Sequence, residues 1–180
     1  MRILAAVLMT VMLTVAGCSG NTAGSGTPGA TPTFNPLTDP TEVPLLLRQE
    51  LGENVTVRRI SLTNNGFSAE VRDPQKPENL DTYRYYGNTW DSDPVSMSMS
   101  DIESLDRTTF GLGAVDWTVI PDLQQQALAG LDLEDEEISV VSIDRIAGQQ
   151  PRVYISVSGA RGYGSLISDA RGRNVEVRRN

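Results

Sequence analysis

Residues 41–46 read Thr-Glu-Val-Pro-Leu-Leu, and residues 118–123 read Thr-Val-Ile-Pro-Asp-Leu. In each stretch a threonine stands where it can cap a helix. A proline follows within the first turn, where its missing N–H removes no hydrogen bond. Apolar residues continue at helical spacing after both prolines, and Gly52 is placed to end the first helix. The two stretches therefore predict two equivalent helices, which are expected to bury Leu46, Leu51, Leu123 and Leu128.

Each expected helix leads into segments in which apolar and polar residues alternate, the pattern of strands with one buried face. The first strand of each set holds Val55, Val57 and Ile60 in one case, and Ile138, Val140 and Ile143 in the other. Both break the alternation after the second apolar residue, which indicates a shared β-bulge. Further strands are expected at 67–71, 83–85, 153–157, 163–167 and 175–177, with turns at 64–66, 147–150 and 169–174.

The order helix, strand, strand, strand occurs twice. We therefore predict an α+β protein of two tandem α-β-β-β units, residues 41–113 and 114–180, each a helix packed on an antiparallel sheet. This order resembles the tandem PepSY-like domains of secreted bacterial proteins, and residues 165–175, with an aspartate-to-glycine turn between late strands, form the most family-like segment. The resemblance implies a module that binds or inhibits other extracytoplasmic proteins and is not an enzyme.

The N-terminal residues follow the order of a signal peptide. Arg2 gives a short positive region, residues 3–15 form an apolar run too short to span a membrane, and small residues follow. The stretch Leu13-Thr14-Val15-Ala16-Gly17-Cys18 resembles the lipobox of bacterial lipoproteins, in which cleavage precedes the cysteine and the thiol is acylated. We expect residues 1–17 to be a lipoprotein signal peptide and Cys18 to be the lipidation site. An ordinary signal peptide with an incidental cysteine is the alternative.

Composition places the folded part outside the membrane. Residues 18–40 are rich in Gly, Ser, Thr and Pro and are expected to form a flexible, lipidated linker. The formal net charge of −8 gives little attraction to nucleic acid or anionic lipid, so attachment must come from acyl chains. These features predict a lipid-anchored protein on the extracytoplasmic face of the cell membrane. Lys76 is the only lysine among the 15 basic residues, a bias that points to a GC-rich, actinobacterial genome.

The absence of histidine excludes much active-site chemistry, including Ser-His triads, Cys-His dyads and histidine zinc sites. Lys76 lies between prolines in an expected solvated loop, so we predict no catalytic residue and no cofactor. Acidic residues 132–137 lack the glycine and the alternation of a calcium loop, and we predict a solvated loop rather than a metal site. Residues 96–100, Ser-Met-Ser-Met-Ser, are predicted to form an alternating strand rather than a copper site.

Two groups of residues are candidates for partner binding. Arg161, Arg171, Arg173 and Arg178 belong to a basic C-terminal region that suits an acidic envelope protein, a polyanionic wall polymer or lipid headgroups. The alternative is that these arginines only cover the solvent face of edge strands. Tyr86 and Trp90 belong to an aromatic cluster that can anchor an interface, although aromatics at strand spacing are more often core residues.

These observations favour a membrane-anchored, non-enzymatic binding or regulatory module for an envelope partner. The alternative is a carrier of a lipid or another apolar ligand, which requires a cavity between the helices and the sheet. A nucleic-acid partner is not expected for a chain of this charge.

Overall fold

The computed structural model describes residues 34–179, and Cys18, the signal peptide and residues 18–33 of the linker lie outside them. The helices are α1 (Glu42–Leu51), α2 (Met99–Thr108) and α3 (Ile120–Leu131), with 3-10 turns η1 (Leu112–Ala114) and η2 (Trp117–Val119). The strands are β1 (Thr56–Thr63), β2 (Gly66–Arg72), β3 (Leu80–Tyr86), β4 (Thr89–Pro94), β5 (Phe110–Gly111), β6 (Glu137–Asp144), β7 (Arg152–Gly159), β8 (Gly162–Asp169) and β9 (Glu176–Arg179).

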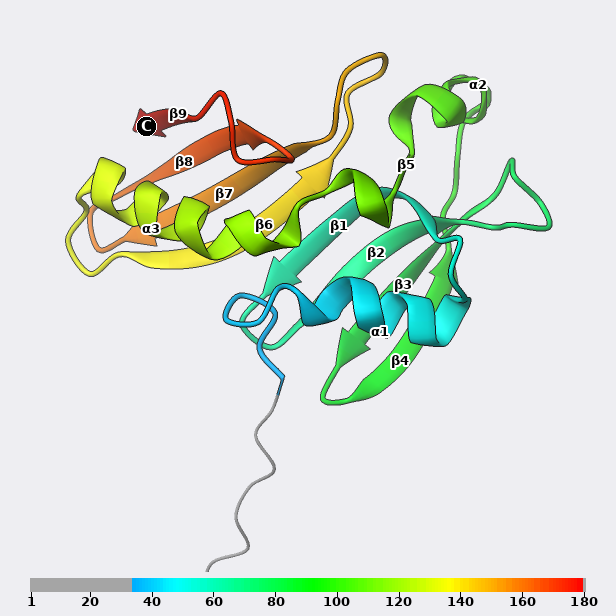
Figure 1. The fold of residues 1–180 in the computed structure, drawn as a ribbon, viewed down its shortest axis with the longest axis horizontal. Coiled ribbons are helices and arrows are strands. Elements are labelled where there is room, and N and C mark those ends of the chain that lie inside the picture. Colours follow the sequence, from blue (N-terminus) through cyan, green and yellow to red (C-terminus); the bar gives the residue numbers. More distant parts are fainter. Residues whose placement is uncertain (1–33, 180) are drawn as a thin grey trace, which may run out of the picture. The chain divides into compact units, whose positions relative to one another are not determined.

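All strands belong to one 9-stranded sheet with the order β4-β3-β2-β1-β6-β7-β8-β9, and β5 pairs with β1 beside β6 (Figure 1). Every pairing between neighbouring strands is antiparallel. The predicted α+β class with an antiparallel sheet is therefore confirmed. Within the described residues, none of the helices combines the length and the apolar character that a membrane span requires.

Alternation along the strands creates a covered face and an open face. The apolar residues of β2 and β7 that were predicted to share a face are all buried, in one core cluster with residues of α1 and α3. α1 lies over β1 to β4, and α3 lies over β6 to β9, on the same side of the sheet (Figure 1). The opposite side, which we call the open face, carries half-buried polar residues such as Ser61, Ser142, Tyr154 and Ser156.

The two predicted helices begin differently from the prediction. Thr41 occupies the N-cap position of α1, but its side chain makes no capping hydrogen bond. Thr118 lies before α3 in η2, where its backbone N–H and hydroxyl both donate to Asp116 Oδ1. The N-cap prediction for Thr118 was wrong because Asp116 caps the preceding turn and α3 starts at Ile120. Gly52 ends α1 with a φ of 90°, as predicted.

The buried helix residues also differ in part from the prediction. Leu123 is 1% exposed, but Leu46, Leu51 and Leu128 are only partly buried at the margin of the core. Leu47, which helical spacing groups with Leu51 on one face, is 0% exposed. The sequence therefore identified the apolar face of α1 but not the depth to which each of its residues is buried.

Both first strands contain an irregularity, but only the one in β1 lies at the predicted place. In β6 it was predicted after Val140, and the structure has it before Val140. The register shifts between Val57 and Arg59 in β1, and between Ile138 and Val140 in β6. The prediction matched Val57 with Val140, whereas the two irregularities match Val57 with Ile138. The shift is two residues, which preserves the alternation of faces and was therefore invisible in the apolar pattern.

The longest elements that the sequence did not predict are α2 and β4. Residues 96–100 were predicted as a strand, but the segment runs into α2, with Ser98 as its N-cap. Ser98 and Asp101 form a reciprocal capping box, a signal that the sequence contained. β4 was also missed, because it carries two aspartates and a proline and has little apolar alternation. Those residues suit an exposed sheet edge, where they discourage pairing with another chain.

The packed part begins before residue 41. Pro36 and Pro40 are buried, and Phe34 and Leu37 pack against the core. The backbone N–H groups of Thr38 and Asp39 donate to the carbonyl of Asn35 and close a turn there. Residues 34–40, which the sequence assigned to the linker, are thus in contact with the core.

Candidate functional site

A row of alternating charges crosses the open face. Arg59 of β1 lies opposite Glu70 of β2 on one side and Asp144 of β6 on the other. Asp144 lies opposite Arg152 of β7, which lies opposite Asp169 of β8. Directly opposed residues of an antiparallel pair are close neighbours, so opposite charges there attract. The row therefore places a line of charge across the strands from β2 to β8, at the ends of β6, β7 and β8.

The irregularity in β1 adds a second arginine to this row. Val57 and Ile60 are both 0% exposed on the covered face. Strict alternation would turn one of the two residues between them toward the core, but the extra residue of a bulge removes that conflict. Arg58 and Arg59 are consequently both available on the open face, and both line the same cavity there.

The carboxylates of the row are already bound by arginines other than Arg59. Arg58 Nε donates to Glu70 Oε2 at 2.6 Å, and Arg152 Nε donates to Asp144 Oδ1 at 2.7 Å. The hydrogen bond with Asp144 raises the pKa of Arg152 above its ordinary value. Arg59 is exposed, and its guanidinium forms no ion pair or hydrogen bond with any residue from 34 to 179.

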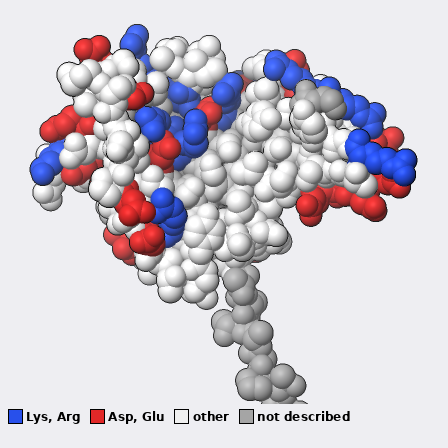
Figure 2. All heavy atoms as spheres, turned by 180° about the vertical axis from the view of Figure 1, so that it is seen from behind, with Lys and Arg blue, Asp and Glu red and all other residues white. Residues whose placement is uncertain are grey.

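A cavity of about 400 Å³ lies over this part of the row. Its lining consists of Arg58, Arg59, Asp101, Ser104, Thr108, Asp144, Arg145, Ile146 and Arg152, and we call it the arginine pocket. The view of the open face shows basic side chains gathered near one another, with acidic side chains between them (Figure 2). Four arginines against two aspartates make the pocket a region of positive charge in an acidic protein.

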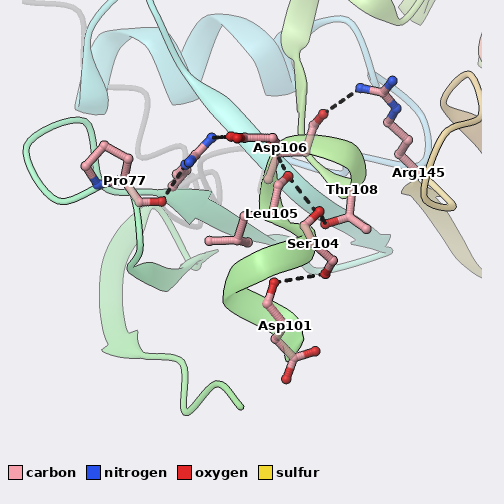
Figure 3. Close-up of polar contacts among 9 residues, drawn as sticks. Pro77, Asp101, Ser104, Leu105, Asp106, Thr108 and Arg145 are labelled. Carbon is pink, nitrogen blue, oxygen red and sulfur yellow. Dashed lines mark hydrogen bonds and ion pairs between the residues drawn. The ribbon is translucent and has the colours of Figure 1, made fainter. Parts of the chain in front are cut away.

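α2 forms one wall of the arginine pocket and is held there by several contacts. Leu105 is 1% exposed and anchors the helix. Arg72 Nη1 donates to Asp106 Oδ1 at 2.6 Å, and Arg145 Nη1 donates to the carbonyl of Thr109 at 2.9 Å (Figure 3). Arg145 Nε also donates to the carbonyl of Gln149 at 2.7 Å. These contacts fix both α2 and the guanidinium of Arg145 at the rim.

Asp101 keeps its charge at the start of α2. Its Oδ2 accepts hydrogen bonds from the hydroxyl and the backbone N–H of Ser98, at 2.7 and 3.0 Å. The side-chain bond, then the backbone bond, lower the pKa of Asp101, and the charge of Arg58 adds to the effect. The pocket therefore contains fixed negative charge on its α2 side and surplus positive charge on its sheet side.

The predicted partner-binding residues are spread over the molecule. Arg161 lies in the hairpin between β7 and β8, and Arg171 and Arg173 lie at the opposite end of β8. Arg178 lies on β9, where its Nε and Nη2 donate to Glu176. Tyr86 and Trp90 belong to β3 and β4, at the other edge of the sheet. The structure does not bring the two predicted groups together.

The aromatic cluster is mainly a packing feature. Trp90 lies 4.9 Å from Tyr85 and 5.6 Å from Phe67, measured between ring centroids, and is half-buried. Phe34 contributes a further edge contact to Tyr85. Tyr86 is 38% exposed and is the member of the predicted pair that presents more surface to solvent. A role of either residue in partner binding stays a prediction.

The predicted turn at 169–174 is confirmed and is organised by Asp169. Its Oδ1 accepts from the backbone N–H groups of Arg171 and Arg173, at 2.9 and 3.0 Å. Gly172 has a φ of 74°, which glycine tolerates without strain. Burial alone would raise the pKa of Asp169, but those two backbone bonds and the charge of Arg173 outweigh it and lower the pKa.

We predict that Asp169→Asn lowers the free energy of unfolding by about 1 kcal/mol at neutral pH, because a charge-assisted set of hydrogen bonds becomes neutral. The lowered pKa fixes the sign of the pH dependence. The difference in free energy of unfolding between wild type and variant has its full value above the ordinary pKa of aspartate. It is lost as pH falls through the folded-state pKa of Asp169. Urea unfolding of both chains across acid pH measures it, and a difference that grows toward low pH would contradict the prediction.

The acidic run at 132–137 contributes to local structure. Asp132 and Asp135 adopt positive φ values of 46° and 51°, and Glu136 Oε2 accepts from the backbone N–H of Leu133 at 3.1 Å. Between residues 34 and 179, no three acidic or sulfur side chains are grouped as a metal site would need.

A second cavity of about 430 Å³ lies beside the C-terminal end of α1, among Glu50, Leu51, Tyr83 and the loop after β2. Burial, and then the charge of Asp81, raise the pKa of Tyr83, so its phenol remains a neutral hydrogen-bond donor. Glu50, Asp73 and Asp81 outnumber Arg72 in its lining, so this cavity is negative like the protein as a whole, whereas the arginine pocket is positive. We therefore take the arginine pocket as the candidate functional site.

Sequence reasoning missed the arginine pocket. The break in alternation at Val57-Arg58-Arg59-Ile60 indicates a bulge, but not which residues lie around the two arginines. The residues that line the pocket with them come from α2, β6, β7 and the loop between these strands, which are distant in sequence. Only the strand registers bring them together.

Comparison with known proteins identifies a shared fold. The chain matches no known protein family, and no curated protein has a significantly similar sequence. A crystal structure from Clostridium difficile 630, described as that of "a putative lipoprotein", superposes with a TM-score of 0.57 and 14% sequence identity. The match covers 78% of this chain and 91% of the clostridial chain. At this identity the likeness shows that the two proteins share an α+β architecture.

Proposed function

We propose that this protein is a lipoprotein of the extracytoplasmic face of the cell membrane, and that its folded part binds an envelope partner or ligand without catalysing a reaction. The observation that carries the binding role is the open face. α1 and α3 both lie on the covered side of the sheet, and the other side carries a cavity with surplus positive charge between the strands and α2. A surface of this kind suits recognition of an anionic group.

Two observations support the lipid anchor. Residues 13–18 have the lipobox order and end in the only cysteine of the chain. The clostridial protein that shares the fold is itself described as a lipoprotein. Acylation of Cys18 would place the folded part near the bilayer, joined by the Gly-, Ser-, Thr- and Pro-rich linker.

We also propose that the sheet is built from two equivalent units, in keeping with the PepSY-like resemblance. α1 precedes β1 to β4, and α3 precedes β6 to β9. Ser61 of β1 lies opposite Ser142 of β6, with the hydroxyl oxygens 3.5 Å apart. When Val57 is matched with Ile138, these two serines are equivalent, so an approximate twofold axis passes between them. Each unit then has four strands rather than the three that the sequence predicted.

The carrier hypothesis finds less support. A carrier of an apolar ligand needs an apolar cavity between the helices and the sheet. The residues at that interface, such as Leu47, Ile60 and Ile143, are 0% exposed and fill it. The two cavities described above are lined largely by polar and charged residues. We therefore place binding on the open face.

We predict that Cys18→Ala removes the protein from the membrane fraction. The chain has no second cysteine to carry acyl groups, which are the proposed anchor. The measurement is fractionation of bacterial cells that express either chain, combined with metabolic labelling by a palmitate analogue. Wild type is expected to be labelled and membrane-bound, and the variant to be unlabelled.

Leu45→Ala is the matched control, because Leu45 is 53% exposed on α1 and plays no part in processing. It should be labelled and fractionate as wild type does. Membrane retention of Cys18→Ala at the wild-type level, with no change in labelling, would show that the lipobox hypothesis is wrong.

A further inference from the structure

We propose that the arginine pocket binds a small phosphorylated polyol, with the phosphate against Arg59 and Arg145 and the hydroxyl groups against α2. The inference deepens the proposed binding function and rests on it. It is carried by one juxtaposition. Two arginines that form no ion pair with any carboxylate in residues 34–179 lie across one cavity from a wall of hydrogen-bond acceptors.

The positive charge on the sheet side is surplus to the fold. Glu70 is bound by Arg58 and Asp144 is bound by Arg152, so each neighbouring carboxylate is already neutralised. Arg59 stands between them with all of its guanidinium donors free of partners in residues 34–179. A guanidinium in this position can donate two parallel hydrogen bonds to a phosphate.

Arg145 supplies a second, preorganised guanidinium. Its Nε and Nη1 donate to the carbonyls of Gln149 and Thr109, which are neutral acceptors and leave the positive charge uncompensated. These bonds also hold the side chain in one conformation at the pocket rim, and Figure 3 shows the bond to Thr109. A ligand then does not have to order this side chain on binding, which favours affinity.

The α2 wall of the pocket presents hydrogen-bond acceptors, so a ligand that pairs with it must supply hydrogen-bond donors. The Ser104 hydroxyl donates to the carbonyl of Asp101 at 2.9 Å, and the Thr108 hydroxyl donates to the carbonyl of Ser104 at 3.1 Å. Their hydrogens are used, so both hydroxyl oxygens face a ligand as acceptors. The Asp101 carboxylate is also only an acceptor while it is charged.

This polarity selects the ligand class. Inorganic phosphate can satisfy the arginines but leaves the acceptors of α2 unpaired. A second anionic group, as in a dicarboxylate, would be repelled by Asp101. A ligand with one phosphate and several hydroxyl groups satisfies both walls. The volume of about 400 Å³ also falls within the range of small-molecule sites.

Two sources offer this chemistry, a soluble sugar or glycerol phosphate and the glycerophosphate headgroup of a membrane lipid. Both can be tested on the full-length Cys18→Ala chain, so that acylation does not contribute. Calorimetric titration with glycerol 3-phosphate at low salt tests the soluble source. Sedimentation with phosphatidylglycerol vesicles, compared with phosphatidylcholine vesicles, tests the lipid source.

We expect saturable binding of glycerol 3-phosphate that weakens with added salt, and weaker binding of inorganic phosphate. Arg59→Gln should lower the affinity about tenfold, the value of one charge-assisted hydrogen-bond set, with the fold intact because Arg59 has no internal partner. Arg48→Gln removes the same charge from α1, which lies on the covered face, and should leave the affinity unchanged. Vesicle binding that depends on Arg59 would assign the lipid source.

Three outcomes would overturn the inference. They are no saturable binding of glycerol 3-phosphate or of phosphatidylglycerol vesicles, equal affinity of the Arg59→Gln and Arg48→Gln chains, or equal affinity for glycerol 3-phosphate and inorganic phosphate. None of them depends on whether Cys18 is acylated. Failure of the pocket and failure of the membrane anchor are thus separate results.

Discussion

Leu47→Ala is expected to lower the free energy of unfolding by about 2–5 kcal/mol, the cost of emptying a well-packed leucine site. Leu47 is 0% exposed in α1 and belongs to the core between that helix and the sheet. Urea unfolding of the full-length chain, followed by tryptophan fluorescence, measures the change. Trp90 and Trp117 both pack against or within the core and report its loss.

Leu45→Ala provides a control with the same chemical change on the same helix. Leu45 is 53% exposed, so the substitution should change the free energy of unfolding by less than about 0.5 kcal/mol. Both variants replace leucine with a better helix former, so propensity cancels between them. Equal destabilisation by the two variants would mean that α1 is rotated relative to the structure.

This comparison also shows what the sequence could predict about the helices. Apolar spacing located α1 and α3 and named Leu123 correctly as a core residue. Helical spacing also grouped Leu47 with Val43 and Leu51 on one face, with Leu46 beside them. It did not show that Leu46 and Leu51 are only partly buried, because the depth of burial depends on packing against residues far along the chain.

The strands were predictable to a similar extent. Alternation gave the buried faces of β2 and β7 correctly, since period two is a local property. It failed for β4, whose residues are mostly exposed, and for the start of α2, where Met97 and Met99 alternate with serine but a capping box begins a helix. The Ser98-x-x-Asp101 pattern is a stronger signal for a helix start than the alternation of Met and Ser is for a strand.

The sequence alone did not reveal the candidate site, because its residues are brought together only by the register in which the strands pair. Arg59, Asp144 and Arg152 become neighbours only when β1 pairs with β6 and β6 pairs with β7. A pairing shifted by one residue would put these charges on the covered face. The predicted arginines were chosen for their density near the C-terminus, and density along the chain does not imply proximity in the sheet.

Gly164→Ala is expected to lower the free energy of unfolding by about 1–3 kcal/mol, the usual cost of overpacking. Gly164 lies in β8, where an added Cβ would contact the side chain of Leu131 and lie 2.8 Å from the carbonyl oxygen of Arg178. The first contact pushes on α3, and the second pushes on β9. Neither group is the free end of a flexible side chain in open solvent.

β9 should respond more than the rest of the sheet, because among the strands of residues 34–179 it pairs with β8 alone. Hydrogen exchange in Gly164→Ala is therefore expected to rise in β9 and at the C-terminal end of α3 before it rises in β1 or β6. Gly113→Ala is the control, since an added Cβ there meets no atom within 4 Å and φ is not in the left-handed region. It should change stability by less than about 0.5 kcal/mol.

The pair of glycine variants tests the placement of α3 and β9 on β8. Three glycines, at 159, 162 and 164, stand close together in the sequence, and composition does not tell which of them is constrained by its neighbours. In the structure, an added Cβ at Gly162 has only a single contact at 3.4 Å, to Leu133. If Gly164→Ala is as stable as Gly113→Ala, Leu131 and β9 do not pack against β8 as described, and the second half of the sheet must be arranged differently.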